Sequence, residues 1–145
     1  MGGLRATEPF VLGQHGALLC DFELLGSQVY SVKWYKDGQE FYRIMPSMED
    51  QFRVFSVPGV TIDQERSNLT TVEVSSIDRH TEGLYSCEVS GKAPSFHTSV
   101  SQARVRVVGE IFEHRTDNII IFYLQLFLLG PSYLECLPLI KLGTW

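Results

Sequence analysis

The sequence predicts an all-β fold, a two-layer sandwich of antiparallel strands in one domain, and three observations predict it. Over residues 11–108, apolar and polar residues alternate in short bursts, as they do in strands with one buried face. Gly, Asp, Ser, Asn and Pro separate these bursts at regular intervals. Two cysteines flank a tryptophan in an order typical of a sandwich core. The length of 145 residues, 44% of them hydrophobic, suits a single globular domain.

Four segments show the period-two alternation of strands, and each defines a set of inward-facing side chains. The segments are "ALLCDF", "YSVKWY", "TVEVSSI" and "LYSCEV". Their inward sets are Leu18, Cys20 and Phe22; Tyr30, Val32 and Trp34; Val72, Val74 and Ile77; and Tyr85, Cys87 and Val89. Together these sets predict the core between the two layers.

A tight hairpin is predicted at Asp37-Gly38, because a type I' turn needs positive φ at both central residues. Around this turn we expect the pairs Lys36 with Gln39, Tyr35 with Glu40, Trp34 with Phe41, and Lys33 with Tyr42. Cross-strand partners share a face of the sheet. Trp34 and Phe41 then belong to the core, and the outward set is Lys33, Tyr35, Glu40 and Tyr42, beside Ser86 and Glu88. A register shifted by one residue would exchange the two sets.

Cys20, Trp34 and Cys87 follow one another in the order found in immunoglobulin domains, and Tyr85 precedes the second cysteine by two residues. That arrangement implies a Cys20–Cys87 disulfide between the two sheets, with the Trp34 indole packed on it and the Tyr85 hydroxyl bonded back to the backbone. The long interval between Trp34 and Cys87 leaves room for the extra strands of a variable-type domain.

The segment "TEGLYSC" departs from the usual immunoglobulin pattern, because Thr81 stands where those domains often carry an aspartate. The Arg-Asp ion pair that often closes one end of variable domains is therefore in doubt. Arg53 lies near the position of the basic partner, and Glu82 is an alternative acid.

Three pieces of the sequence, "YSVKWYKDGQEFYRI", "VFSVPGV" and "YSCEVSGKAPSFHT", resemble the first immunoglobulin domain of the arthropod beaten path family. The resemblance covers residues 8–108. It implies an extracellular domain, usually followed by a second immunoglobulin domain. It also implies a neuronal cell-surface or secreted ligand that binds Sidestep family immunoglobulin receptors and guides motor axons.

A protein-binding surface is predicted on the outward side of this hairpin. Tyrosines offer large, rigid contact area with a polar tip and are enriched at binding hot spots. The predicted partner-binding residues are Lys33, Tyr35, Glu40, Tyr42, Glu88, Pro94 and Phe96. An ordinary solvated sheet is the alternative. On the first interpretation, Tyr42→Ala combined with Lys33→Glu leaves the fold intact and weakens receptor binding.

Two features concern the cellular location. Asn68-Leu69-Thr70 is an N-glycosylation sequon, which suits a secreted or cell-surface protein. The opening "MGGLRATEPF" does not resemble a signal peptide, so we expect either a cytosolic protein or a chain whose start is missing.

Beyond the domain, the sequence changes character. We expect residues 1–7 to form an N-terminal extension, residues 8–108 the immunoglobulin-like domain, and residues 109–145 an atypical apolar tail that is disordered or partly helical. The apolar run 119–129 is short for a membrane span, so membrane contact through residues 119–142 is weakly indicated. Cys136 is left without a partner. One hypothesis is that the tail derives from intron read-through or a truncated gene model.

Composition excludes several functions. A net charge of -5 without basic clusters gives no surface for nucleic acid. No cofactor, metal or small-molecule substrate is expected, since no zinc-type spacing and no nucleophile-base arrangement occurs, and an enzyme is not predicted. Two alternatives to a recognition protein remain: a structural immunoglobulin module without a signalling partner, and a truncated, non-functional fragment.

Overall fold

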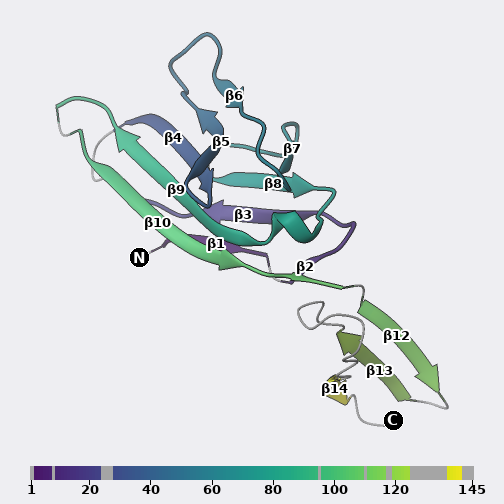
Figure 1. Ribbon diagram of the computed structural model, residues 1–145. Coiled ribbons are helices and arrows are strands. Elements are labelled where there is room, and N and C mark those ends of the chain that lie inside the picture. The colour runs from purple at the N-terminus through teal and green to yellow at the C-terminus, as the bar shows by residue number, and fades with distance from the viewer. Residues whose placement is uncertain are drawn as a thin grey trace.

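The computed structural model describes residues 2–7, 9–23, 28–94, 96–109, 111–116, 119–124 and 137–141, with side chains described up to residue 109. The predicted all-β sandwich is confirmed (Figure 1). Its strands are β1 (Leu4–Ala6), β2 (Phe10–Val11), β3 (Gly16–Cys20), β4 (Val29–Lys36), β5 (Gln39–Ile44), β6 (Phe52–Val54), β7 (Thr61–Asp63), β8 (Thr71–Ser75), β9 (Gly83–Gly91), β10 (Thr98–Val105) and β11 (Val107–Val108). A 3-10 turn, η1 (Arg79–Thr81), precedes β9.

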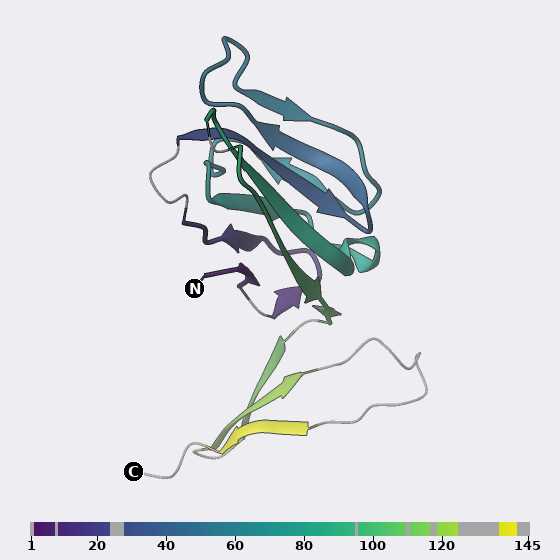
Figure 2. The same ribbon diagram turned by 90° about the vertical axis from the view of Figure 1, so that its left-hand side faces the viewer.

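Two antiparallel sheets form the layers of the sandwich (Figures 1 and 2). One sheet has four strands in the order β1-β3-β8-β7, and the other has five in the order β10-β9-β4-β5-β6. A short parallel pair, β2 with β11, joins the N-terminal part of the chain to the end of the domain. Strands β5 and β6 fill the interval after Trp34, where the sequence predicted the extra strands of a variable-type domain.

The core lies between the sheets and is closed by the predicted disulfide. Cys20 of β3 and Cys87 of β9 are bonded, with their Cα atoms 6.4 Å apart. Trp34 pairs with Cys87 on the neighbouring strand. The three side chains predicted for the core, Trp34, Phe41 and Tyr85, are fully buried. The five-stranded and four-stranded sheets are thus stapled through the middle of the apolar layer.

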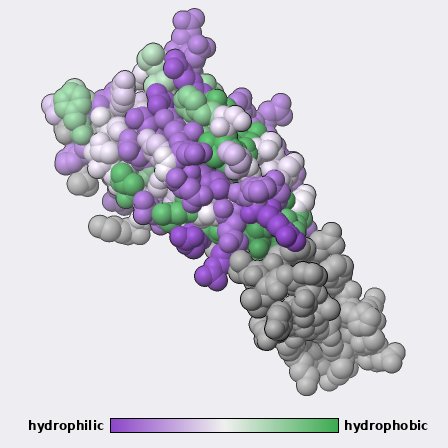
Figure 3. Space-filling model, in the orientation of Figure 1, coloured by the Kyte–Doolittle hydropathy of each residue, from purple (hydrophilic) through white to green (hydrophobic). Residues whose placement is uncertain are grey.

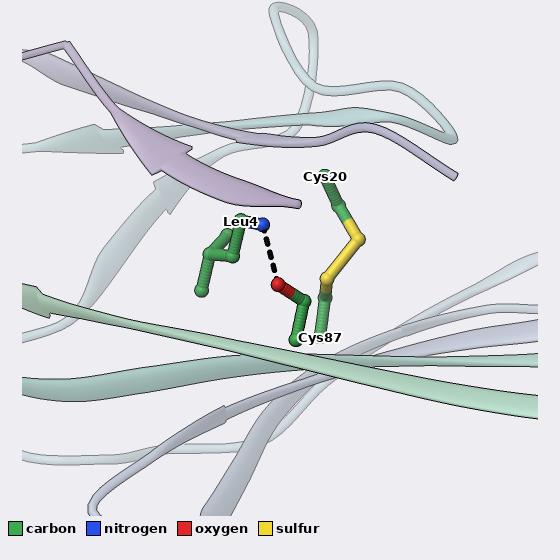
Figure 4. The surroundings of a disulfide bond; sticks show 4 residues. Leu4, Cys20 and Cys87 are labelled. Carbon is green, nitrogen blue, oxygen red and sulfur yellow. Dashed lines mark hydrogen bonds between the residues drawn. A yellow bond between two sulfur atoms is a disulfide. The ribbon is translucent and has the colours of Figure 1, made fainter. Parts of the chain in front are cut away.

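Strand β1 adds a second connection between the sheets. Leu4 is buried and pairs with Cys20 in the four-stranded sheet, while its amide donates a hydrogen bond of 2.7 Å to the Ser101 hydroxyl of β10 in the other sheet (Figure 4). The expectation that residues 1–7 lie outside the domain is therefore wrong. The alternation in "LRA" is too short to distinguish a strand from a loop, so the boundary at residue 8 was placed too late.

The turn around η1 shows what replaces the ion pair of other variable domains. The Tyr85 hydroxyl donates to the Thr81 carbonyl oxygen at 2.6 Å, as expected for this corner. Thr81 itself is buried, and its hydroxyl donates to the Gly59 carbonyl oxygen at 2.7 Å. Arg53 lies on β6 and is exposed, and the Glu82 carboxylate accepts from the Val107 amide at 3.2 Å. Hydrogen bonds of Thr81, Tyr85 and Glu82 close this end.

The described part of the tail forms strands. β12 (Ile111–Thr116), β13 (Ile119–Leu124) and β14 (Leu137–Lys141) make a three-stranded antiparallel sheet. The expectation of a disordered or partly helical tail is wrong for these residues, because the β-branched residues Ile119, Ile120 and Ile121 favour strands. Within the described residues no helix is long and apolar enough to cross a membrane. Cys136 lies outside the described residues.

Candidate protein-binding face

The hairpin turn between β4 and β5 forms at Asp37-Gly38, as predicted. Both residues have positive φ, 48° and 81°. The turn is anchored to β9, since the Asp37 amide donates to the Leu84 carbonyl oxygen at 2.7 Å and the Asp37 carboxylate accepts from the Leu84 amide at 2.9 Å. The Leu84 amide, with help from the Lys36 ammonium 3.0 Å away, lowers the pKa of Asp37. The turn therefore fixes β4 and β5 against β9.

The register of the hairpin follows the prediction for two pairs and then shifts. Lys36 faces Gln39 and Tyr35 faces Glu40, but Trp34 faces Tyr42 and Lys33 faces Arg43. Phe41 is the extra residue of a β-bulge, which lets two successive side chains point to the same side. The prediction of Trp34 opposite Phe41 and Lys33 opposite Tyr42 is wrong beyond this bulge.

The bulge places both aromatic residues of β5 in the interior. Phe41 meets the Tyr85 ring edge-on, with centroids 5.8 Å apart, and Tyr42 stacks on Phe52 at 6.3 Å. Tyr42 is fully buried, so its assignment to the outward set was wrong. Arg43 occupies the outward position instead. The two adjacent aromatic residues in "EFY" are the sequence signal that could have indicated the bulge, since strict alternation would expose one of them.

We call the solvent side of the five-stranded sheet the outer face, defined by Lys33, Tyr35, Glu40, Arg43 and Glu88. Two ion pairs organise it. The Lys33 ammonium lies 3.5 Å from the Glu88 carboxylate, and the Arg43 guanidinium makes two parallel hydrogen bonds to Glu40, at 2.6 and 2.8 Å. Tyr35 stands between these pairs, and burial together with Glu88 and Glu40 raises the pKa of its hydroxyl. The hydroxyl therefore stays protonated and can donate a hydrogen bond.

The exposed large apolar side chains are distributed unequally. Among the described residues, six belong to the five-stranded sheet or to a loop that joins its strands: Tyr30, Met48, Phe52, Val54, Phe96 and Val100. The seventh, Phe55, directly follows β6. Val100 pairs with Glu88 and so shares the outer face, and the Phe55 ring lies 5.7 Å from the Arg43 guanidinium. Figure 3 shows apolar groups interspersed with polar ones on the visible side. The described residues of the four-stranded sheet contribute none.

One end of the outer face carries an aromatic tip, formed by Tyr30, Pro94 and Phe96. Phe96 is 71% exposed and Tyr30 is 53% exposed. Tyr30 was expected in the core, but a register shift between Val29 and Ser31 turns it outward. Both rings line a shallow cavity of about 330 Å³ together with Lys92, whose ammonium is bonded to Ser47 and Gln28. The tip therefore presents apolar surface with a cation at its base.

The arrangement offers contact area for a partner. In the described part of the chain, no group of three or more His, Cys, Asp or Glu side chains is placed to hold a metal ion. The carboxylates of the outer face are each paired with a cation, which leaves charged groups and aromatic rings set in fixed positions.

Comparisons with known proteins show the fold. No family model matches the sequence, and no curated protein sequence matches it either. The solved V domain of amphioxus IgVJ-C2 is similar, with a TM-score of 0.54 and 19% identity over 68% of this chain and 96% of that one. The first immunoglobulin-like domain of human CD48 antigen has a TM-score of 0.53 at 14% identity, over 74% and 84%. Murine CEACAM1b has a TM-score of 0.58 at 12% identity, over 90% and 69%.

These similarities, the disulfide and the strand order define the class of the protein. The chain contains an immunoglobulin variable-type domain, in which the strands β10, β9, β4, β5 and β6 form the larger sheet.

Proposed function

We propose that this domain is a cell-surface or secreted recognition module that binds Sidestep-like immunoglobulin receptors through its outer face. Its role is heterophilic cell adhesion in motor axon guidance. The resemblance of residues 8–108 to the beaten path family supports the partner, and the variable-type fold suits a protein-binding domain.

The unequal distribution of exposed apolar side chains carries this proposal. Five exposed large apolar side chains lie on the outer face or in segments next to its strands: Tyr30, Met48, Phe55, Phe96 and Val100. Phe52 and Val54 pair with the buried Ile44 and Tyr42 and belong to the edge strand β6. Exposed apolar groups rimmed by charges are typical of protein-binding surfaces. A merely solvated sheet gives no reason for such an imbalance between two sheets of one domain.

The ion pairs of the outer face add specificity. Fixed charges steer encounter and penalise partners with like charges, and they add less to raw affinity. The bidentate Arg43–Glu40 pair lies beside the Tyr35 ring. This pair holds the ring in one orientation before a partner binds. Tyr35 is therefore the expected anchor, because ordering it on binding costs little conformational entropy.

Binding to a panel of Sidestep-like receptors tests the proposal, measured by surface plasmon resonance with the full chain. Tyr35→Ala should weaken binding by about tenfold or more, the loss typical of an interface anchor. Lys33→Glu should also weaken binding, because the new carboxylate would lie opposite Glu88 on the neighbouring strand and the two like charges would repel each other. Tyr42→Ala is unsuitable here, since the buried ring supports the fold.

The matched control is Glu73→Lys on β8 of the four-stranded sheet, where the new lysine faces Asp63 across the strands. This variant should bind like the original chain. Unchanged affinity of folded Tyr35→Ala and Lys33→Glu for every receptor that binds would refute the assignment of the outer face.

Passage through the secretory pathway is the second part of the proposal, and Asn68 is the expected glycosylation site. The side-chain oxygen of Asn68 accepts hydrogen bonds from the Thr70 amide at 3.0 Å and the Thr70 hydroxyl at 3.1 Å. Asn68 is exposed in the turn between β7 and β8. The sequon is thus held in an accessible turn.

Mass spectrometry of the protein secreted by animal cells tests this part. We expect a Cys20–Cys87 bridge and a glycan on Asn68 that disappears in Thr70→Ala. Free thiols and an unmodified Asn68 in the native protein would instead support a structural module of the cytosol.

A further inference from the structure

Strand β6 is the last strand of the five-stranded sheet, and no described strand pairs with its outer side, which leaves an open edge. The Met45 amide donates to the Gln51 carbonyl oxygen, and the Phe55 amide donates to the Phe41 carbonyl oxygen, so Gln51 and Phe55 direct backbone groups toward β5. Backbone direction alternates along a strand. The N–H and C=O groups of Phe52 and Val54 therefore point away from β5, toward the open edge.

The side chains at this edge are unusually apolar for an unpaired strand. Phe52 is 48% exposed and Val54 is 46% exposed, on the same side of the strand. Open edges usually avoid such residues, because they are templates for pairing with another chain. Backbone groups and apolar side chains are thus available together at the same two residues.

Between these apolar residues stands a cation. Arg53 faces Arg43 across the strands and shares the outer face with it. Glu40 neutralises Arg43 through two hydrogen bonds, whereas no described acidic side chain forms an ion pair with Arg53. Beside the open edge, the positive charge of Arg53 is therefore uncompensated.

This charge determines what can pair with the edge. A second copy of the chain, aligned antiparallel so that Phe52 faces Val54 in both directions, would place Arg53 opposite Arg53. The backbone N–H and C=O groups of Arg53 point toward β5, so Arg53 would form a non-hydrogen-bonded pair with the residue opposite it on a new strand. In such a pair the Cα atoms approach to about 4.5 Å, and two like charges there oppose pairing. A partner strand with an acid at this position removes the repulsion.

We propose that β6 recruits an extended segment of a partner protein as a sixth strand, with an acidic residue opposite Arg53 and apolar residues opposite Phe52 and Val54. Main-chain hydrogen bonds from the open edge supply affinity, and the alternating apolar and acidic side chains supply specificity. The site is separate from the outer-face residues of the receptor proposal and does not depend on that receptor.

A peptide titration of the ¹⁵N-labelled full chain, followed by NMR, tests this inference. The probe is the capped peptide "STVEVTS", and its matched control is "STVKVTS". We expect saturable shifts of the Phe52 and Val54 amides with the acidic peptide. The lysine peptide should bind about fivefold more weakly, the upper range for changing one cross-strand charge pair.

Variants separate the backbone from the charge. Val54→Pro removes an amide that points to the open edge and keeps the ladder to β5, so peptide binding should be lost while the fold persists. Arg53→Glu should reverse the preference and bind the lysine peptide more tightly. Arg5→Glu, on edge strand β1 of the other sheet, should change neither the affinity for the acidic peptide nor the preference over the lysine peptide.

Three results would overturn the inference. They are absence of saturable shifts at millimolar acidic peptide, equal affinity for the two peptides, and a concentration-dependent dimer of the chain that Val54→Pro dissolves. Should Val54→Pro fail to fold, the reversal by Arg53→Glu still decides. Tyr35→Ala should leave peptide binding unchanged, so this test and the receptor test fail independently.

Discussion

The two sheets share one core but present different surfaces to solvent. The outward side chains of the described four-stranded sheet are polar or small apart from the half-buried Leu19, whereas the five-stranded sheet, its loops and the adjoining Phe55 carry all seven of the exposed large apolar groups found. Both sheets contribute fully buried residues to the same apolar layer, for example Val72 and Trp34. The comparison teaches that packing and recognition are separable here. Changes in the core should affect both sheets, and changes on the outer face should affect binding with little effect on stability.

Removing the staple between the sheets should produce the largest effect on stability. The Cys20–Cys87 bridge closes a loop with a sequence separation of 67 residues. Loop-closure entropy for this length corresponds to about 4 kcal/mol. The double variant Cys20→Ala/Cys87→Ala should lose a comparable free energy of unfolding in urea titrations. A loss below about 1 kcal/mol would show that β1 and the apolar layer hold the sheets without it.

Tyr42 tests whether the bulge is real. Tyr42→Ala should lower the free energy of unfolding by about 3 to 5 kcal/mol, as truncation of a buried aromatic ring does. The Tyr42 hydroxyl is buried and has no hydrogen-bond partner among the described groups. Tyr42→Phe should therefore be neutral or stabilising, because it removes an unsatisfied polar group. If calorimetry showed no loss of stability for Tyr42→Ala, Tyr42 would have to lie on the outer face.

This residue also shows where prediction from sequence succeeds and fails. The Asp37-Gly38 turn was predictable, since only a few residue pairs tolerate positive φ at both positions. The immunoglobulin-like order of Cys20, Trp34 and Cys87 implied the disulfide, and period-two alternation predicted the burial of Trp34. A bulge inserts one residue without any compositional requirement, so the register beyond Phe41 was not predictable from period-two alternation. The same kind of shift turned Tyr30 outward.

The candidate site was predictable in part for the same reason. Lys33, Tyr35, Glu40 and Glu88 lie on the outer face as expected. Tyr35 and Glu40 pair before the bulge is reached, and Lys33 faces Glu88 on β9, away from the bulged strand. Arg43 was missed. Thr81 illustrates a different limit: the sequence showed that the usual acid is absent, but only the structure shows the Gly59 carbonyl oxygen that its hydroxyl meets.

Asp37 should give the domain a small dependence of stability on acid. The Leu84 amide and Lys36 lower the pKa of Asp37 in the folded state below its ordinary value of 3.8. Its contribution to stability is therefore complete above that value and is lost as pH falls through the lowered folded-state pKa. The free energy of unfolding, measured from neutral to acidic pH, should fall less steeply at the acidic end for Asp37→Asn than for the original chain. An identical slope in both proteins would contradict the anchoring role of the carboxylate.

The smallest expected effect belongs to the ion pair of the outer face. A double-mutant cycle with Glu40→Gln and Arg43→Gln should yield a coupling of about 0.2 to 1 kcal/mol in the free energy of unfolding, as is usual for partly exposed pairs. Coupling of several kcal/mol would mean that the pair serves the fold, and it would blur the contrast between core and outer face.

Hydroxyl-radical footprinting of the receptor complex tests the central claim most directly, because it compares both sheets in one sample. We predict protection of Tyr35, Phe55 and Phe96 on the side of the five-stranded sheet, with unchanged oxidation of Leu19 and Leu69 on the other side. Protection confined to Leu19 and Leu69, with Tyr35 and Phe96 oxidised as in the free chain, would contradict the account.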